Sequence, residues 1–110
     1  MNANKIKTVI QELVRELVEL KYQDIYEQDY EKITSAPAIQ EAIESYGQVL
    51  TMPPNSAFEN IDIYETDNPN KIQVDFDLWF NNKKSDLTLS CAVYDDGKKG
   101  KYSIENIHML

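Results

Sequence analysis

The 110-residue sequence contains 19 acidic and 11 basic residues, a formal net charge of −8, and 42% hydrophobic residues. This length suits one domain, and the hydrophobic content is too high for a disordered segment. We expect a single α+β domain over residues 1–110, with helices over about 4–47 and a sheet over about 58–109. The acidic excess argues against nucleic acid and anionic membranes as partners, because both repel negative charge.

Several site types are excluded by the sparse cysteine, histidine and glycine. Cys91 and His108 are the only residues of their kinds, so neither an internal disulfide nor a cysteine- or histidine-based metal cage is expected. The three glycines form no phosphate-binding loop, and no cofactor is expected. Charged residues interrupt the beginning of the chain too early for a signal peptide or a membrane span, which predicts a cytoplasmic protein.

Helical periodicity dominates the first half of the chain. Apolar residues recur on one predicted helical face: Ile6, Val9, Ile10, Leu13, Val14, Leu17 and Val18. Asn2 or Asn4 can cap this helix. A second helical stretch is predicted to carry Ile25, Tyr26, Asp29, Tyr30 and Ile33. A third is predicted to begin at Thr34 or Ser35 and to end near Gly47, before an irregular Pro53-Pro54-Asn55 segment.

The second half alternates between apolar and polar residues, as half-buried strands do. A two-residue turn at Asn82-Lys83 would pair residues whose sequence numbers add up to 165. Phe76 would then face Leu89, and Trp79 would face Asp86. By the same reasoning Ile63 would face Val74. These pairings predict a four-stranded antiparallel meander whose inner face is covered by the helices.

The last hairpin is predicted around the dipeptide Asp96-Gly97. That turn would place Cys91 opposite Tyr102 and Leu89 opposite Ile104. The apolar residues that follow Ile104 are out of phase, which predicts a bulge near Glu105-Asn106.

The outer face of this sheet is the main candidate surface. The predicted partner-binding residues are Asp62, Asp75, Asp77, Trp79, Asp86, Tyr64 and Tyr94, with Phe58 nearby. Asp62 would lie opposite Asp75, and like charges in that arrangement destabilise a sheet. That the sequence tolerates this cost indicates that the carboxylates serve to bind a basic partner, with Trp79 as an aromatic anchor. A solvated outer face, with Trp79 partly covered by a neighbour, is the alternative interpretation.

Other site chemistry has weaker support in the sequence. Asp75 and Asp77 could hold a hard cation, but no calcium-loop glycine pattern accompanies them. Cys91 falls on the apolar face, where a cysteine is usually inert. Ser85-Asp86 has only His108 as a base, and His108 lies close to the C-terminus. No catalytic residue is therefore assigned.

Two motifs resemble a known family. Residues 43–47 with Leu50 resemble an I-x-x-Y-G-x-x-L segment, and residues 76–79 followed by 85–90 resemble D-L-W and S-D-L-x-L. In order over roughly residues 10–109, they are similar to a family of small bacterial proteins with a domain of unknown function. Helices followed by a meander also resemble cystatin-like and nuclear-transport-factor-like folds.

This chain departs from that family's pattern at two places. It has Asn81-Asn82-Lys83-Lys84 where an acidic, glycine-containing turn is expected, and it lacks a tryptophan in the strand before Asp77. The family carries no catalytic residues that could be transferred to this chain. In size, acidity and lack of catalytic motifs the chain is similar to bacterial toxin-immunity proteins. That similarity implies an inhibitor that occludes the active site of a basic toxin, such as a nuclease.

Two other functions remain open at this point. A cone-shaped α+β fold could bind a small ligand, or perform acid/base chemistry, in a pocket between helices and sheet. In that case inner tyrosines such as Tyr22, Tyr26 and Tyr30 would matter, and the outer aspartates would not. A homodimer formed through the outer sheet face is the third possibility.

Overall fold

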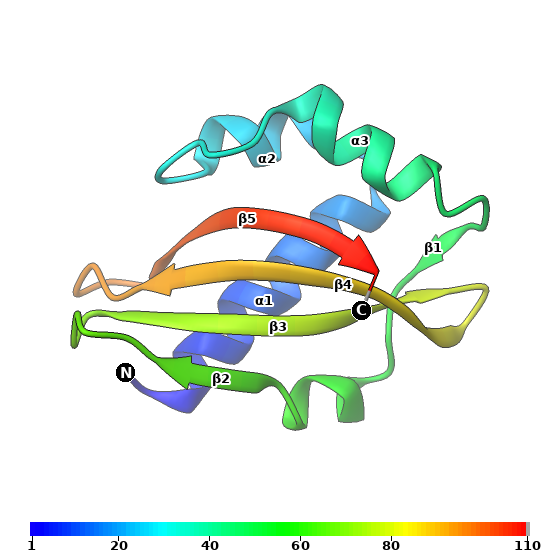
Figure 1. The fold of residues 1–110 in the computed structure, drawn as a ribbon. Helices are drawn as coiled ribbons and strands as arrows, with labels where there is room; N and C mark the ends of the chain where they lie inside the picture. Colours follow the sequence, from blue (N-terminus) through cyan, green and yellow to red (C-terminus); the bar gives the residue numbers. More distant parts are fainter. Residues whose placement is uncertain (110) are drawn as a thin grey trace.

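The computed structural model describes residues 1–109, in which three helices precede an antiparallel sheet (Figure 1). The elements in chain order are α1 (Ala3–Val18), α2 (Tyr22–Gln28), α3 (Ala36–Glu44), β1 (Leu50–Thr51), the 3₁₀ helix η1 (Asn55–Glu59), β2 (Asp62–Glu65), β3 (Lys71–Phe80), β4 (Lys83–Tyr94) and β5 (Lys101–Met109). The predicted α+β class is confirmed. No helix among residues 1–109 is long and apolar enough to cross a membrane.

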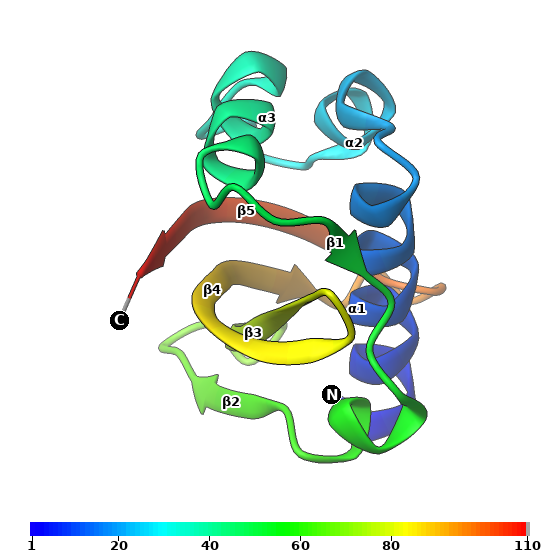
Figure 2. The same ribbon diagram turned by 90° about the vertical axis from the view of Figure 1, so that its right-hand side faces the viewer.

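Helix α1 packs along one face of the sheet, here called the inner face (Figures 1 and 2). Its start is capped by Asn2, whose side chain accepts hydrogen bonds from the backbone N–H groups of Asn4 (2.7 Å) and Lys5 (3.3 Å). Six of the seven predicted apolar positions are buried, and Val18 packs at their margin. The 3.6-residue period therefore identified both the helix and its buried face.

The second predicted helical stretch was too long. Helix α2 ends at Gln28, and Asp29 is extended with φ −64° and ψ 130°. Tyr30 and Ile33, predicted to continue the apolar face, are each 55% exposed. Helix α3 begins at the predicted Ser35 cap, whose hydroxyl accepts from the Ala38 N–H (3.2 Å), and ends at Glu44, before Gly47.

The sheet contains the four predicted strands in meander order and a fifth, short strand that the prediction missed. β1 and β2 both pair with β3: β2 pairs with its beginning, and β1 with its end through Leu50↔Phe80 and Thr51↔Trp79. The segment after Pro53-Pro54, predicted to be irregular, forms η1 at residues 55–59. A two-residue strand is too short to show alternation, so only its pairing with β3 reveals it.

The β3–β4 register is the predicted one over most of its length. Phe76 lies opposite Leu89 and Asp77 lies opposite Thr88, so the numbers of the paired residues add up to 165 as predicted. Towards the turn a bulge shifts the pairing, so that Trp79 lies opposite Lys84; the predicted Trp79–Asp86 pair is wrong.

The observed turn residues explain this shift in register. Asn81 (φ 49°) and Asn82 (φ 63°) form the turn, because two consecutive positive φ angles match the twist of a hairpin. The Ser85 hydroxyl donates to the Leu78 carbonyl (2.6 Å) at the bulge, where two additional residues of β4 are accommodated.

Up to the bulge in β5, the β4–β5 register differs from the prediction by two residues. Beyond the bulge the predicted Leu89–Ile104 pair is also wrong, because Leu89 lies opposite Ile107. Cys91 lies opposite Ile104 rather than Tyr102, and Tyr102 lies opposite Val93. A shift of two keeps every side chain on its predicted face, because strand side chains alternate with period two. The predicted bulge is confirmed, since Cys91 faces Ile104 while Ser90 faces Asn106, which leaves Glu105 unpaired.

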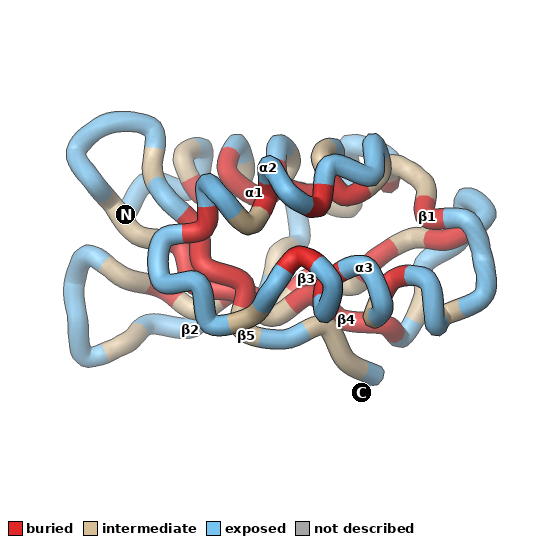
Figure 3. Tube along the Cα trace, turned by 90° about the horizontal axis from the view of Figure 1, so that it is seen from above, coloured by how far each residue is buried: buried red, intermediate tan, exposed pale blue. Residues whose placement is uncertain are grey.

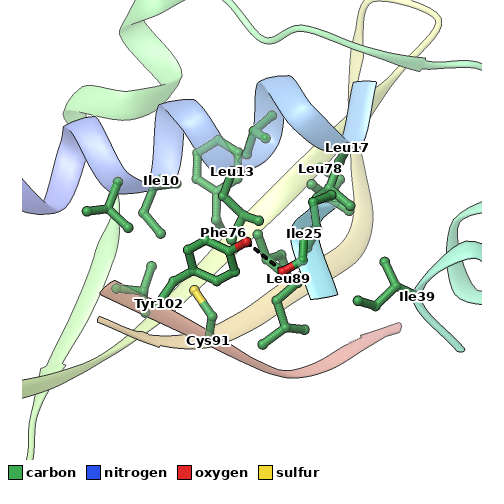
Figure 4. Packing of buried hydrophobic residues seen from close by; sticks show 14 of the residues in the cluster. Ile10, Leu13, Leu17, Ile25, Ile39, Phe76, Leu78, Leu89, Cys91 and Tyr102 are labelled. Carbon is green, nitrogen blue, oxygen red and sulfur yellow. Dashed lines mark hydrogen bonds between the residues drawn. The ribbon is translucent and has the colours of Figure 1, made fainter. Parts of the chain in front are cut away.

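The core lies between α1 and the inner face of the sheet (Figures 3 and 4). Fully buried residues from α1, α2 and the central strands meet there; they include Ile10, Leu13, Leu17, Ile25, Leu78, Leu89 and Cys91. The Tyr102 hydroxyl donates to the Ile25 carbonyl (2.8 Å), which ties β5 to α2. Burial raises the pKa of the Cys91 thiol, which keeps it protonated and unreactive.

The segment between α2 and α3 covers part of the edge of β5. The buried Asp29 accepts hydrogen bonds through Oδ1 from the Ser103 hydroxyl (2.8 Å) and through Oδ2 from the Ile104 N–H (2.8 Å). The Tyr30 N–H donates to the Tyr102 carbonyl (2.9 Å). Backbone groups that an edge strand would otherwise expose are therefore satisfied within the chain.

Candidate functional site

The outer face of the sheet carries no helix over β2, β3 and β4 in the described part of the chain (Figures 1 and 2). Asp75, Asp77 and Trp79 lie on this face because every second residue of β3 points to the same side. Asp62 joins them from β2, directly opposite Asp75. These four residues and Lys84 line a recess of about 350 Å³, here called the outer recess, with Ser56 and Asn60 at its border.

Hydrogen bonds from β4 orient two of the carboxylates. Asp75 Oδ1 accepts from the Ser90 hydroxyl (2.7 Å), and Asp77 Oδ1 accepts from the buried Thr88 hydroxyl (2.9 Å). The second oxygen of Asp75 and both oxygens of Asp62 accept no hydrogen bond from residues 1–109. The outer recess therefore presents unfilled acceptor positions, and the Ser90 bond orients the one on Asp75.

Lys84 supplies the positive charge at the outer recess. Its Nζ lies 3.4 Å from Asp77 Oδ2, in a pair whose side chains are 66% and 34% exposed. Lys84 reaches this position because the bulge places it opposite Trp79. The predicted register placed Asp86 there instead, so sequence reasoning could not find Lys84.

His108 contributes to a hydrogen-bonded chain across three strands. Its Nε2 lies 3.1 Å from the Ser90 hydroxyl oxygen, which donates its hydrogen to Asp75. His108 must then be the donor to Ser90. As the donor to Ser90, the His108 imidazole cannot remove the serine proton, and the Asp75 carboxylate opposes the negative charge of a serine alkoxide. This chain orients Asp75 rather than activating a nucleophile.

The combination of Ser85, Asp86 and His108 considered from the sequence is not assembled. The serine that His108 contacts is Ser90, whereas Ser85 is bonded to the Leu78 carbonyl at the bulge. The contact depends on the β5 bulge, which places His108 opposite Thr88, next to Ser90. The bulge was predicted at this place, but the β4–β5 register was predicted two residues out, so sequence reasoning did not bring His108 next to Ser90.

The other predicted partner-binding residues lie outside the outer recess. Asp86 is exposed, and its carboxylate receives a 3.4 Å hydrogen bond from Tyr46. Tyr64 is 52% exposed on β2, opposite Gln73. Phe58, expected near the outer face, is buried and stacks on the inner residue Phe76 with ring centroids 5.0 Å apart.

Tyr94 lies at the opposite end of β4 from the outer recess, opposite Lys71. Its ring packs edge-on against Tyr30 with centroids 4.9 Å apart, and its hydroxyl donates to Glu31. Partial burial, followed by the bond to the Glu31 carboxylate, raises the pKa of Tyr94. These contacts give Tyr94 a packing role beside the α2–α3 segment.

We expect replacement of Asp62 by asparagine to stabilise the fold. Asp62 and Asp75 are directly opposed, and relief of like-charge repulsion across an antiparallel pair is worth about 0.2–1 kcal/mol. Urea denaturation would show a higher midpoint for Asp62→Asn than for the native chain. Asp67→Asn, in the turn after β2, removes the same charge and is the control. An equal or lower midpoint for Asp62→Asn would contradict the repulsion.

No group of three or more His, Cys, Asp and Glu side chains suited to a metal ion occurs among residues 1–109. Asp62, Asp75 and Asp77 all line the outer recess, but they do not form such a group.

A family model described as a domain of unknown function (DUF7668) matches residues 14–110. Neither a curated protein nor a solved structure matches the chain.

Proposed function

Because the chain belongs to the family described as a domain of unknown function (DUF7668), we propose its function from its own surface. It is a small acidic binding protein of the immunity type, which occludes the active site of a basic toxin in the cytoplasm. The outer recess and the adjoining face of β2 and β3 form the binding surface. The carboxylates take the place of substrate phosphates when the toxin is a nuclease.

The observation that carries this proposal is the grouping of three carboxylates with the only tryptophan of the chain. Asp62, Asp75 and Asp77 lie together although two of them repel each other across the sheet. Tryptophan is enriched where protein interfaces bury an aromatic anchor, and carboxylates beside it complement a basic surface. A purely solvated face needs neither feature.

The remaining charge and exposed side chains support a protein partner. The net charge of −8 attracts basic proteins over long range and speeds their association at low salt. Tyr64, 52% exposed and opposite Gln73, extends the outer face beyond the outer recess along β2. Two copies of the same acidic face would repel each other, which favours a basic partner over a homodimer.

A ligand pocket between the helices and the sheet has less support. The side chains that meet there, such as Leu13 on α1 and Leu89 on β4, have no exposed surface and fill the interface (Figure 4). The outer recess, in contrast, is open and polar.

The test is capture of the partner from a lysate of the source cell at low and at high salt. We expect the native chain to retain a basic protein at low salt and to release it when salt screens the charges. Asp75→Asn/Asp77→Asn should not retain it, because each asparagine keeps a side-chain oxygen for Ser90 or Thr88 but removes the charge.

The matched control is Glu27→Gln/Glu41→Gln, which removes the same charge from exposed positions on α2 and α3. It should retain the partner as the native chain does. Equal capture by Asp75→Asn/Asp77→Asn, or equal loss in both double variants, would overturn the assignment of the outer face. Inhibition of the captured protein's activity by the native chain, and not by Asp75→Asn/Asp77→Asn, completes the test.

A further inference from the structure

We propose that the outer recess binds the guanidinium group of one arginine side chain of the partner. The inference rests on the proposed function, because it names the partner group that this surface receives. Three features of the outer recess carry it: the carboxylate spacing, the indole wall, and a lysine that already places an ammonium group there.

The spacing of the carboxylates suits a group that carries several hydrogen-bond donors in one plane. Asp75 and Asp77 are two residues apart on β3, which separates their attachment points by about 7 Å. Asp62 stands beside Asp75 at a cross-strand distance of about 5 Å. A guanidinium carries five N–H donors in a fixed fork, so it can bond two neighbouring carboxylates at once. An ammonium group is a compact point charge without this geometry.

Trp79 provides a flat wall beside the carboxylates. The strand pairs Trp79 with Thr51 of β1 on one side and with Lys84 of β4 on the other, so its backbone is held from both sides. Its side chain is partly exposed and lines the outer recess. Guanidinium groups stack on indole faces more readily than ammonium groups, because they are planar and weakly hydrated.

Lys84 shows that a cation has a place in the outer recess. Its ammonium lies 3.4 Å from Asp77 Oδ2, yet two thirds of its side chain is exposed, so the pair is weak and readily displaced. An incoming arginine would compete with Lys84 for Asp77. Removal of Lys84 should therefore strengthen the binding of an arginine, whereas an arrangement in which Lys84 contacts the partner predicts the opposite.

The size of the outer recess limits the occupant. Ligand pockets span about 300–1,000 Å³, and a volume of about 350 Å³ lies at the lower end of that range. It suits one side chain rather than a large ligand.

Trp79 fluorescence reports binding directly, because Trp79 is the only tryptophan. The probes are the capped tripeptides Gly-Arg-Gly and Gly-Lys-Gly, titrated into the full chain at constant ionic strength. We expect a saturable change of Trp79 emission with the arginine peptide and clearly weaker binding of the lysine peptide. Lys84→Gln should tighten arginine binding by up to about fivefold, the largest effect of an exposed pair.

Asp75→Asn/Asp77→Asn should abolish the response, and Glu27→Gln/Glu41→Gln should leave it unchanged. The urea midpoint of each variant shows that it is folded. Equal affinity for both peptides, weaker binding by Lys84→Gln, or an unchanged response in folded Asp75→Asn/Asp77→Asn would overturn the arginine assignment. If the arginine peptide fails while the native chain still captures a basic protein in a carboxylate-dependent way, only the arginine inference fails. If capture also fails, the proposed function fails with it.

Discussion

Replacement of Asp29 by alanine is expected to lower the free energy of unfolding by about 3–4 kcal/mol, since each buried donor left unpaired costs about 1–3 kcal/mol. Asp29 is 2% exposed and accepts from the Ser103 hydroxyl, the Ile104 N–H and the Lys32 N–H. Alanine cannot accept any of these bonds. The Ile104 N–H is the most affected, because it is a buried backbone donor on an edge strand.

The same substitution should change the behaviour of the β5 edge. Loss of Asp29 loosens the segment that covers Tyr102 and Ile104, and uncovered edge strands pair with other chains. Size-exclusion chromatography of Asp29→Ala should therefore show a larger share of oligomers than the native chain at the same concentration. Asp29→Asn, which retains one acceptor oxygen, should be intermediate in stability.

Denaturation by urea, followed by circular dichroism, measures the Asp29 effect. Asp24→Ala is the matched control, because Asp24 is an exposed aspartate on α2. Surface substitutions of this kind change stability by less than about 0.5 kcal/mol. Equal midpoints for Asp29→Ala and Asp24→Ala would show that the Asp29 side chain contributes nothing to stability, contrary to this prediction.

Leu13→Ala should destabilise the fold by about 3–5 kcal/mol, the range for a buried leucine that leaves a cavity when shortened. Leu13 has no exposed surface and lies between α1 and the inner face of the sheet (Figure 4). Glu12→Ala, at the adjacent exposed position of α1, should have little effect.

The size of the Leu13 effect also separates two functions. In a close-packed interface the truncation leaves a cavity and lowers the free energy of unfolding strongly. In an interface that already contains a ligand pocket, the shortened side chain removes fewer contacts and the loss of stability is smaller. A loss below about 1.5 kcal/mol, far under the range for close-packed leucines, would favour the pocket between helices and sheet. A loss in the expected range, with Trp79 fluorescence following the same transition, supports a filled core and leaves the outer face as the binding surface.

Much of the candidate site could be predicted because it depends on local periodicity. Alternation along β3 places Asp75, Asp77 and Trp79 on one face, and the β2–β3 register adds Asp62 opposite Asp75. Both follow from the spacing of apolar residues, since a slip by one residue would bury the polar set. The same reasoning identified α1 and its buried face.

The pairing of residues next to the turns was predicted less accurately, because the conformation of each turn depends on hydrogen bonds made by its side chains. The Asn81-Asn82 turn and the Ser85 bond to Leu78 move Lys84 beside Trp79 and keep Asp86 away from it. In the next loop Asp95 and Asp96 accept hydrogen bonds from the Gly97 and Lys98 N–H groups. The longer loop shifts the β4–β5 register by two residues and leaves the faces of the strands unchanged.

The sequence by itself determined the class of fold, the inner and outer faces of the sheet, and the acidic row on β3, because each repeats with a fixed period. Only the tertiary structure decided the roles of Asp29, Lys84 and His108. Their contacts join residues distant in sequence: Asp29 bonds Ser103 and Ile104 across more than seventy positions. Local periodicity does not indicate which distant residues come into contact. The Asp29 carboxylate reaches the edge of β5, and the His108 imidazole reaches Ser90, only in the folded chain.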